Sequence, residues 1–164
     1  MNGQHDLIYM DSNATTLLDP AVVDVMINHL QHSKLYGNAS SSHSLGQRSR
    51  QSIEQARKYV HQCINAEYVD EILFTSGGTE SNNIAIQGII HQSKSDQIQH
   101  IITSPFEHPA VENVLRHLEQ SNENVKISYV RVLPDGTIDL DHFRQLLKPE
   151  TKLVTIMHSN NEIG

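Results

Sequence analysis

The segment HIITSPFEHPAVENVLRHLEQSNENVKISYVRV (residues 100–132) contains the pattern that decides the fold. An apolar run ends at Ser104, a polar loop follows, and Pro109 stands where a helix would begin. The next apolar residues recur at helical spacing: Val111, Val114, Leu115 and Leu118. The run KISYVRV then has the composition of a second strand. Strand, helix and strand in this order predict a parallel β-α-β unit with a right-handed crossover.

The same alternation continues on both sides of this segment. The elements expected before it are a helix from Pro20 with Asp19 as its N-cap, a helix over residues 45–65, a short buried strand EILFTS (71–76) and a helix from Gly78. Those expected after it are a Pro-Asp-Gly turn, a helix over residues 140–147 and a strand KLVTIMH (152–158). There is no repeat and no linker. Residues 1–164 are therefore predicted to form one α/β domain of three layers, with a mainly parallel sheet between flanking helices.

The first two expected helices each carry an apolar stripe. The stripe residues are Val22, Val23, Met26, Ile27 and Leu30 in the first helix, and Ile53, Ala56, Val60, Cys63 and Ile64 in the second. The stripe of the second helix is expected to face the core. The single cysteine, Cys63, is therefore predicted to pack as a small hydrophobic residue and not to act as a nucleophile.

Composition argues against several classes of function. The 164 residues carry a formal charge of −7, and their 12 Lys and Arg are dispersed, so no nucleic-acid partner is expected. No apolar stretch approaches the ~20 residues of a membrane span, and the first residues lack the apolar region of a signal peptide. The 11 histidines include no His-Glu-x-x-His motif, so no metal site is expected. We expect a soluble, cytoplasmic protein without a membrane partner.

Three polar clusters follow expected strands: TSGGTES (75–81), SPFEHP (104–109) and HSNNEIG (158–164). Ligands of open parallel sheets gather beyond the carboxyl ends of the strands. These clusters are far apart in the sequence, but the fold could bring all three to one edge of the sheet.

Each cluster also has a purely structural interpretation. Gly77 and Gly78 precede a helix N-terminus, where backbone N–H groups and the helix dipole favour a phosphate and the hydroxyls of Thr79 and Ser81 add donors. The pair could equally form a plain turn. His108 could present its ring to the edge of the sheet or simply mark the entry to a helix. Asn160 and Asn161 offer amide groups, yet asparagine is also an ordinary loop residue.

Six blocks together resemble the cysteine desulfurases, pyridoxal-5'-phosphate enzymes of aminotransferase class V. The blocks are YMDSNATT, YGNASSSHSLGQRSR, ILFTSGGTESNNIAIQG, HIITSPFEHPAVENV, DGTIDLDHF and TIMHSNNEIG. The resemblance implies the N-terminal part of the large domain of a fold-type I pyridoxal-phosphate transferase, in which residues 1–45 form the N-terminal segment and first helix.

The resemblance also implies roles for individual residues. Gly77, Gly78 and Thr79 match the loop that holds the cofactor phosphate. His108 matches a catalytic histidine that stacks on the pyridine ring and acts in proton transfer. Asn161 matches an asparagine that binds the ring hydroxyl and lies near the substrate carboxylate, and Asn13 belongs to a segment near the active site.

The implied reaction takes sulfur from L-cysteine, leaving L-alanine and a persulfide on a cysteine of the enzyme. The implied partners are a second copy of the chain and a sulfur-acceptor or scaffold protein. Iron–sulfur cluster assembly and tRNA thiolation are the processes that such enzymes serve.

The resemblance ends before several groups of the family pattern. Its pyridine-binding aspartate, Ser-x-His-Lys lysine, cysteine loop and carboxylate-binding arginine would all follow Gly164, and no lysine of this chain matches that motif. We therefore expect no independent catalysis, and an unpaired sheet edge that makes the chain marginally stable or prone to aggregate when expressed alone.

Three interpretations stay open. The chain could be the N-terminal part of a cysteine desulfurase, which a complementary C-terminal chain would complete. It could be a non-catalytic module that binds pyridoxal phosphate. It could also belong to a related class V enzyme, such as a selenocysteine lyase or a desulfurase for DNA sulfur modification.

Overall fold

The computed structural model describes residues 8–31, 34–92 and 97–163. The chain divides into two compact units, Met1–Phe74 and Thr75–Gly164.

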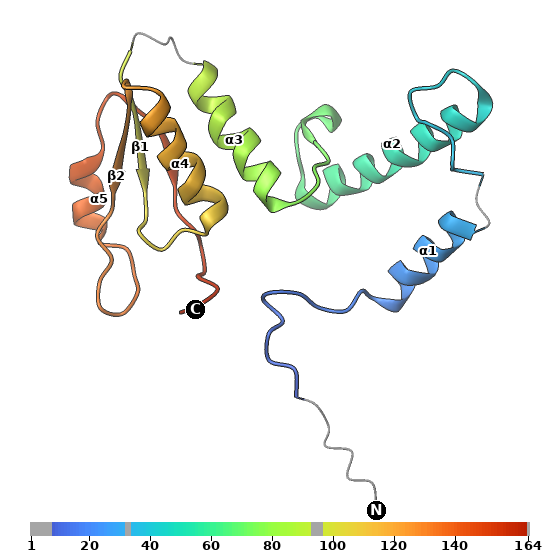
Figure 1. Ribbon diagram of the computed structural model, residues 1–164, viewed down its shortest axis with the longest axis horizontal. Helices are drawn as coiled ribbons and strands as arrows, with labels where there is room; N and C mark the ends of the chain where they lie inside the picture. Colours follow the sequence, from blue (N-terminus) through green and yellow to red (C-terminus); the bar gives the residue numbers. More distant parts are fainter. Residues whose placement is uncertain (1–7, 32–33, 93–96, 164) are drawn as a thin grey trace, which may run out of the picture. The chain divides into compact units, whose positions relative to one another are not determined.

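The second unit is built on a parallel three-stranded sheet (Figure 1). Strand β1 (Gln99–Thr103) lies between β2 (Val125–Tyr129) and β3 (Thr151–Thr155). Ile101 of β1 lies opposite Ile127 on one side and Leu153 on the other. The predicted parallel β-α-β unit is therefore confirmed.

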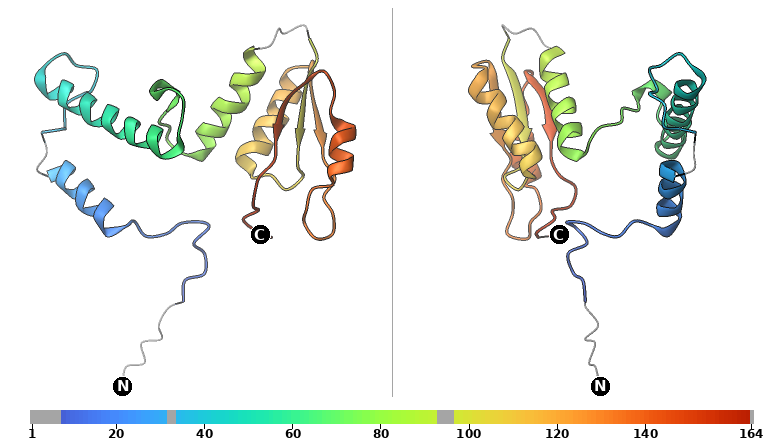
Figure 2. Two further views of the ribbon diagram at one scale, coloured as in Figure 1. Left: turned by 180° about the vertical axis from the view of Figure 1, so that it is seen from behind. Right: turned by 45° about the vertical axis from the view of Figure 1, so that its right-hand side comes forward.

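Helices cover both faces of this sheet. Helix α3 (Gly78–Gln92) packs against α4 (Pro109–Ser121), and the two helices contact β3 and β2 respectively. Helix α5 (Leu140–Leu146) lies on the opposite face of the sheet from α4 (Figures 1 and 2). The expected three layers are present in this unit.

The core of the second unit lies between the sheet and helices α3 and α4. Its buried members are Ile86, Ile90, Ile101, Val111, Val114, Leu115, Leu118 and Val125. The four apolar residues that the sequence placed on the inner face of α4 are all among them. The amphipathic pattern of this helix thus predicted its buried face correctly.

The loop between β2 and α5 makes the expected Pro-Asp-Gly turn. Gly136 has a φ of +86°, a conformation that favours glycine, and its N–H donates to the Leu133 carbonyl at 2.9 Å. Asp139 then caps α5 by accepting a hydrogen bond from the His142 N–H at 2.9 Å.

The described residues of the first unit form two helices and a short 3-10 turn. Helix α1 spans Pro20–Gln31, α2 spans Ser44–Ile64 and η1 spans Val69–Glu71. Asp19 accepts a hydrogen bond from the Ala21 N–H at 2.8 Å, as expected for an N-cap. None of the helices among the described residues is long and apolar enough to span a bilayer.

The strand expected over residues 71–76 is not formed. This segment begins in η1 and continues as an irregular stretch in which Leu73 and Phe74 are exposed. The Arg57 guanidinium donates to the Ile72 carbonyl and stacks over the Phe74 ring. A side chain therefore takes a backbone acceptor that a neighbouring strand would otherwise use, and the prediction was wrong.

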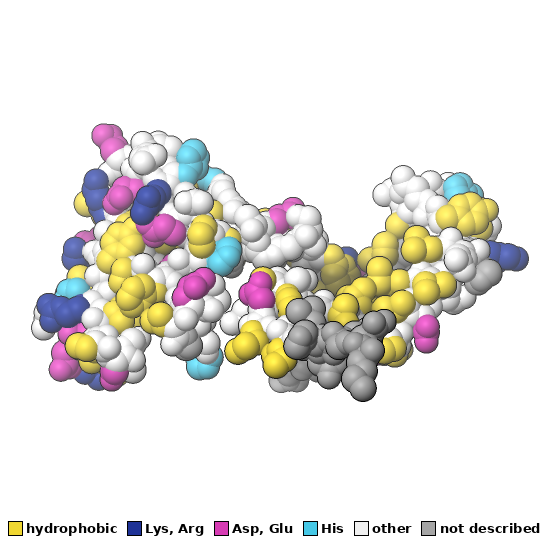
Figure 3. All heavy atoms as spheres, turned by 60° about the horizontal axis from the view of Figure 1, so that its bottom comes forward, with side chains coloured by type: hydrophobic (Ala, Val, Ile, Leu, Met, Phe, Trp, Pro, Cys, Tyr) yellow, Lys and Arg dark blue, Asp and Glu magenta, His cyan; other side chains and the backbone are white. Residues whose placement is uncertain are grey.

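The predicted burial of Cys63 in the apolar stripe of α2 is also wrong in the described structure. Helix α1 has no buried residue, Cys63 is exposed, and apolar side chains of this unit lie at the surface (Figure 3). Helical spacing predicts which face is apolar, but burial needs a surface that packs against that face. The buried residues of α2 are instead Gly46 and Ser49, near its N-terminus.

Candidate functional site

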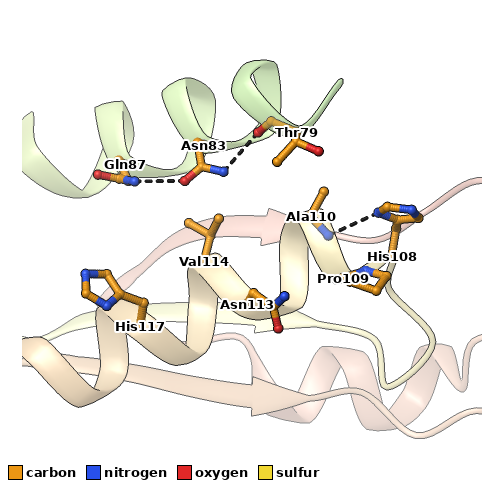
Figure 4. A pocket seen from close by; sticks show the side chains of 9 residues that line it. All are labelled: Thr79, Asn83, Gln87, His108, Pro109, Ala110, Asn113, Val114 and His117. Carbon is orange, nitrogen blue, oxygen red and sulfur yellow. Dashed lines mark hydrogen bonds between the residues drawn. The ribbon is translucent and has the colours of Figure 1, made fainter. Parts of the chain in front are cut away.

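A cavity of about 360 Å³ lies between helices α3 and α4 (Figure 4). Its walls are Thr79, Asn83 and Gln87 from α3, and His108, Pro109, Ala110, Asn113, Val114 and His117 from the start and first turns of α4. The second unit alone therefore brings Thr79 and His108 to one cavity, although they are 29 positions apart in the sequence.

The glycine pair at the start of α3 faces open space. A Cβ built on either Gly77 or Gly78 would meet no atom within 4 Å, and neither residue has a positive φ. Neither local packing nor backbone conformation therefore requires glycine here. The bare backbone leaves the helix N-terminus accessible, as an anion-binding site needs.

The polar side chains around the glycine pair are mostly engaged with the loop itself. The Glu80 carboxylate accepts hydrogen bonds from the Ser76 N–H at 2.6 Å and the Ser76 hydroxyl at 2.8 Å, which lower the pKa of Glu80. The hydroxyls of Thr75 and Ser81 lie 2.7 Å apart. Ser81, expected as a phosphate donor, thus takes part in the loop, whereas Thr79 lines the cavity.

His108 is the N-cap of α4. Its Nδ1 accepts a hydrogen bond from the Ala110 N–H at 3.0 Å, and its ring lines the cavity (Figure 4). Because Nδ1 is the acceptor, the neutral ring carries its proton on Nε2. The two interpretations of His108 are therefore compatible, since one nitrogen caps the helix and the other stays available for chemistry.

Asn161 does not line this cavity. It follows β3 in the segment beyond the carboxyl end of that strand, and its Nδ2 donates to Glu162 at 3.1 Å. Its neighbour Asn160 lines a second cavity of about 330 Å³ and donates from Nδ2 to the Phe106 carbonyl at 2.9 Å. The second and third polar clusters therefore meet at the carboxyl ends of β1 and β3.

Asn13 lies in the first unit, in an exposed turn where the Ala14 N–H donates to the Asp11 carbonyl at 3.1 Å. The structure thus places this residue in a different unit from the other predicted site residues.

Sequence reasoning missed a set of polar residues in the α3–α4 cavity. Asn83 Nδ2 donates to the Thr79 carbonyl at 2.9 Å, and Gln87 Nε2 donates to Asn83 Oδ1 at 3.0 Å. Asn113 and His117 face them from α4. The signal was present in the sequence, because positions 79, 83 and 87 recur at intervals of four and share one helical face. Within the described ranges, no group of three or more His, Cys, Asp or Glu is arranged to hold a metal ion.

The sequence profile of the family described as aminotransferase class-V matches residues 8–164. The chain belongs to the aminotransferase class V family. It is 44% identical over 158 residues to the cysteine desulfurase IscS of Rickettsia massiliae, which covers 96% of this chain and 37% of the relative. It is also 43% identical to a mitosomal cysteine desulfurase of Trachipleistophora hominis, covering 96% of this chain and 35% of that protein. This class V chain thus spans well under half the length of the curated relatives it matches.

Solved structures agree with this family and fold. A NifS-like protein superposes with a TM-score of 0.87 at 35% identity, covering 96% of this chain and 42% of the other. SspA in complex with cysteine superposes with a TM-score of 0.82 at 32% identity, covering 94% and 43%. DndA from Streptomyces lividans superposes with a TM-score of 0.75 at 37% identity, covering 94% of this chain and 42% of the other. The predicted fold class and the resemblance to cysteine desulfurases are therefore confirmed.

Proposed function

We propose that this class V chain supplies the phosphate-binding and ring-binding part of a cysteine desulfurase that uses pyridoxal 5'-phosphate. The observation that carries the proposal is the cavity shared by Thr79 and His108, beside a helix N-terminus whose two glycines leave open space. The similarity to cysteine desulfurases over 96% of the chain supports the same reaction.

The residues at the start of α3 fit a phosphate dianion. The open space beside Gly77 and Gly78 can admit phosphate oxygens up to the backbone N–H groups of the first helical turn. Thr79 adds a hydroxyl donor from the same turn. When bound, pyridoxal phosphate supplies an electron sink for the carbons next to the substrate amine.

His108 is proposed to face the cofactor ring and to move a proton through Nε2. The hydrogen bond from the Ala110 N–H to Nδ1 fixes the ring orientation and leaves Nε2 for the substrate side. Asn161 is proposed to bind the ring hydroxyl and the substrate carboxylate with its side-chain amide, and Asn13 to lie at the substrate side of the site. L-cysteine is the proposed substrate, because SspA, solved in complex with cysteine, shares this fold at 32% identity.

The complete reaction needs groups that this chain does not match. In the family pattern that the sequence resembles, the lysine and the sulfur-accepting cysteine follow the segment matched here, and the chain spans 37% of the IscS relative. We propose that sulfur transfer requires this second portion, and that a second copy of the chain and a sulfur-acceptor protein take part, in iron–sulfur cluster assembly or tRNA thiolation.

The phosphate site can be tested on the 164-residue chain by titration with pyridoxal phosphate, followed by absorbance and calorimetry. We expect Thr79→Val to weaken binding about tenfold, since a hydrogen bond to a charged group is lost. Thr79→Ser keeps the hydroxyl and should bind as the wild type does. Pyridoxal without the phosphate should bind far more weakly, and inorganic phosphate should compete. Equal binding of pyridoxal and pyridoxal phosphate would contradict the site.

The reaction requires a separate measurement. The chain should be produced alone and together with the portion of the IscS relative that it does not span, and sulfide and alanine release from L-cysteine measured with a reductant present. We expect release only from the second preparation. A preparation that binds pyridoxal phosphate but yields neither product would contradict the proposed reaction while leaving the binding site intact.

A further inference from the structure

We infer that Glu107 and Asn160 are positioning residues that together hold His108 and Asn161 in place. The inference rests on the proposed function, because it concerns the two residues proposed to contact the cofactor ring. Each positioning residue immediately precedes the residue that it holds: Glu107 comes before His108, and Asn160 comes before Asn161.

Glu107 joins the ends of two strands. Its Oε1 accepts hydrogen bonds from the Ser104 hydroxyl at 2.7 Å and from the Met157 N–H at 2.8 Å. Ser104 follows β1, and Met157 lies two residues beyond the end of β3. One carboxylate oxygen therefore ties the loop that carries His108 to the segment that carries Asn161. Hydrogen bonds to an ionised acceptor are roughly twice as strong as neutral ones.

Asn160 makes the reciprocal connection. Its Nδ2 donates to the Phe106 carbonyl at 2.9 Å and lies 3.1 Å from the Met157 sulfur. Its Oδ1 accepts from the N–H groups of Glu162 at 2.8 Å and Ile163 at 3.1 Å. The side chain thus fixes the turn in which Asn161 sits and fastens that turn to the loop before His108.

These bonds stand where regular secondary structure is absent. Residues 104–108 and 156–163 belong to no helix or strand, so no ladder of backbone hydrogen bonds holds them. Glu107 is partly buried and accepts from a backbone N–H, which gives the link a defined geometry. A ligand ring bound between the two loops would meet side chains already in position, and would lose less free energy in ordering them.

The test uses three variants and two matched controls. Glu107→Ala removes the carboxylate, Glu107→Gln keeps an oxygen acceptor, and Asn160→Ala removes the reciprocal link. Glu119→Ala is the first control. The Glu119 carboxylate also accepts a hydrogen bond from a backbone N–H, that of Ile127 in β2 at 3.2 Å, which is away from the two loops. Asn122→Ala is the second control, because Asn122 accepts from the Asn124 N–H at 3.0 Å just beyond the end of α4.

Two readouts separate positioning from folding. The first, without cofactor, is the NMR signal of the Met157 amide, the Asn161 side-chain amide and the His108 ring. The second is the dissociation constant for pyridoxal phosphate. We expect Glu107→Ala and Asn160→Ala to shift all three signals and to weaken binding about tenfold, with Glu107→Gln restoring most of both. The controls should leave both readouts unchanged.

Different failures have different meanings. If the wild-type chain does not bind pyridoxal phosphate, the proposed function fails, and the NMR signals still test the two links. Unchanged His108 and Asn161 signals in Glu107→Ala and Asn160→Ala would overturn the inference. An equal effect of Glu119→Ala, or a Glu107→Gln variant as impaired as Glu107→Ala, would overturn it as well. If an alanine variant unfolds by circular dichroism, the folded Glu107→Gln variant still decides between restored and lost signals.

Discussion

His100 is the most deeply buried ionisable side chain in the described sheet. It is only 2% exposed, and its two ring nitrogens lie 2.8 Å from the hydroxyls of Thr151 and Ser128. These hydroxyls belong to the strands on either side of β1, so one imidazole links all three strands. Burial, and then the charge of Lys148, lower the pKa of His100 below its usual value of 6.5, although Glu150 opposes this shift.

This pKa gives the stability of the second unit a pH dependence. Because the pKa is lower in the folded state, the unfolded chain binds more protons near pH 6. The contribution of His100 is therefore present above about pH 6.5 and is lost as the pH falls below that value. We expect His100→Gln to lower the unfolding free energy by about 1–2 kcal/mol at pH 7.5, and by less at pH 5. Urea unfolding at both pH values measures this, with the exposed His91→Gln as control. An equal loss of unfolding free energy at both pH values would contradict this pH dependence.

At the scale of elements, the helix ends follow their sequences closely. Asp19, His43, His108 and Asp139 each accept a hydrogen bond from a backbone N–H in the first turn of the helix that follows. The two glycine sites at helix N-termini differ sharply. Gly77 faces open space, whereas a Cβ on Gly46 would lie 2.5 Å from the Asn38 carbonyl oxygen and 2.6 Å from that of Ser41.

Gly46 should therefore be a structural requirement of the first unit. We expect Gly46→Ala to lower thermal stability and the protection of residues 34–50 from hydrogen exchange, because backbone atoms would have to move to admit the methyl group. Gly88→Ala is the matched control, since apart from its chain neighbours and the backbone of α3 no atom lies within 4 Å of its missing Cβ. That change should raise stability by about 0.5–1 kcal/mol. Unchanged thermal stability in Gly46→Ala would show that the loop can move to admit the methyl group with little loss of free energy.

At the scale of the whole molecule, the hydrophobic core found among the described residues belongs to the second unit. Leu115 is 0% exposed at its centre, and the sheet and helices around it all lie after Phe74. In the first unit, Ile72 is buried, but Val22, Met26 and Ile53 are each more than 40% exposed. The two units should therefore differ in stability.

Leu115→Ala tests this difference. A buried leucine truncated to alanine costs about 2–5 kcal/mol, so exchange protection should fall across residues 97–130. Peptides from residues 34–74 should keep their wild-type exchange rates. The half-exposed Leu147→Ala serves as control. An equal loss of protection in both units would show that they unfold together.

Much of the fold was predictable from local pattern. The β-α-β unit around α4, its buried face and the turn at Gly136 followed from periodicity and turn chemistry, because each depends on residues close together in the chain. The strand expected over residues 71–76 failed because pairing depends on a distant partner, and Arg57 takes the Ile72 carbonyl instead. The predicted burial of Cys63 was wrong for a similar reason, since an apolar stripe does not specify which surface covers it.

The candidate site divides in the same way. Local sequence patterns predicted the family and the glycine pair at the start of α3, and offered helix entry as one interpretation of His108, because motif spacing and helix signals are local. Three features came from packing and could not be predicted: Thr79 and His108 share a cavity, Ser81 bonds within its own loop, and Glu107 and Asn160 link two strand ends. These contacts join residues up to 54 positions apart, and such distances are fixed by how helices and strands pack, not by the residues alone.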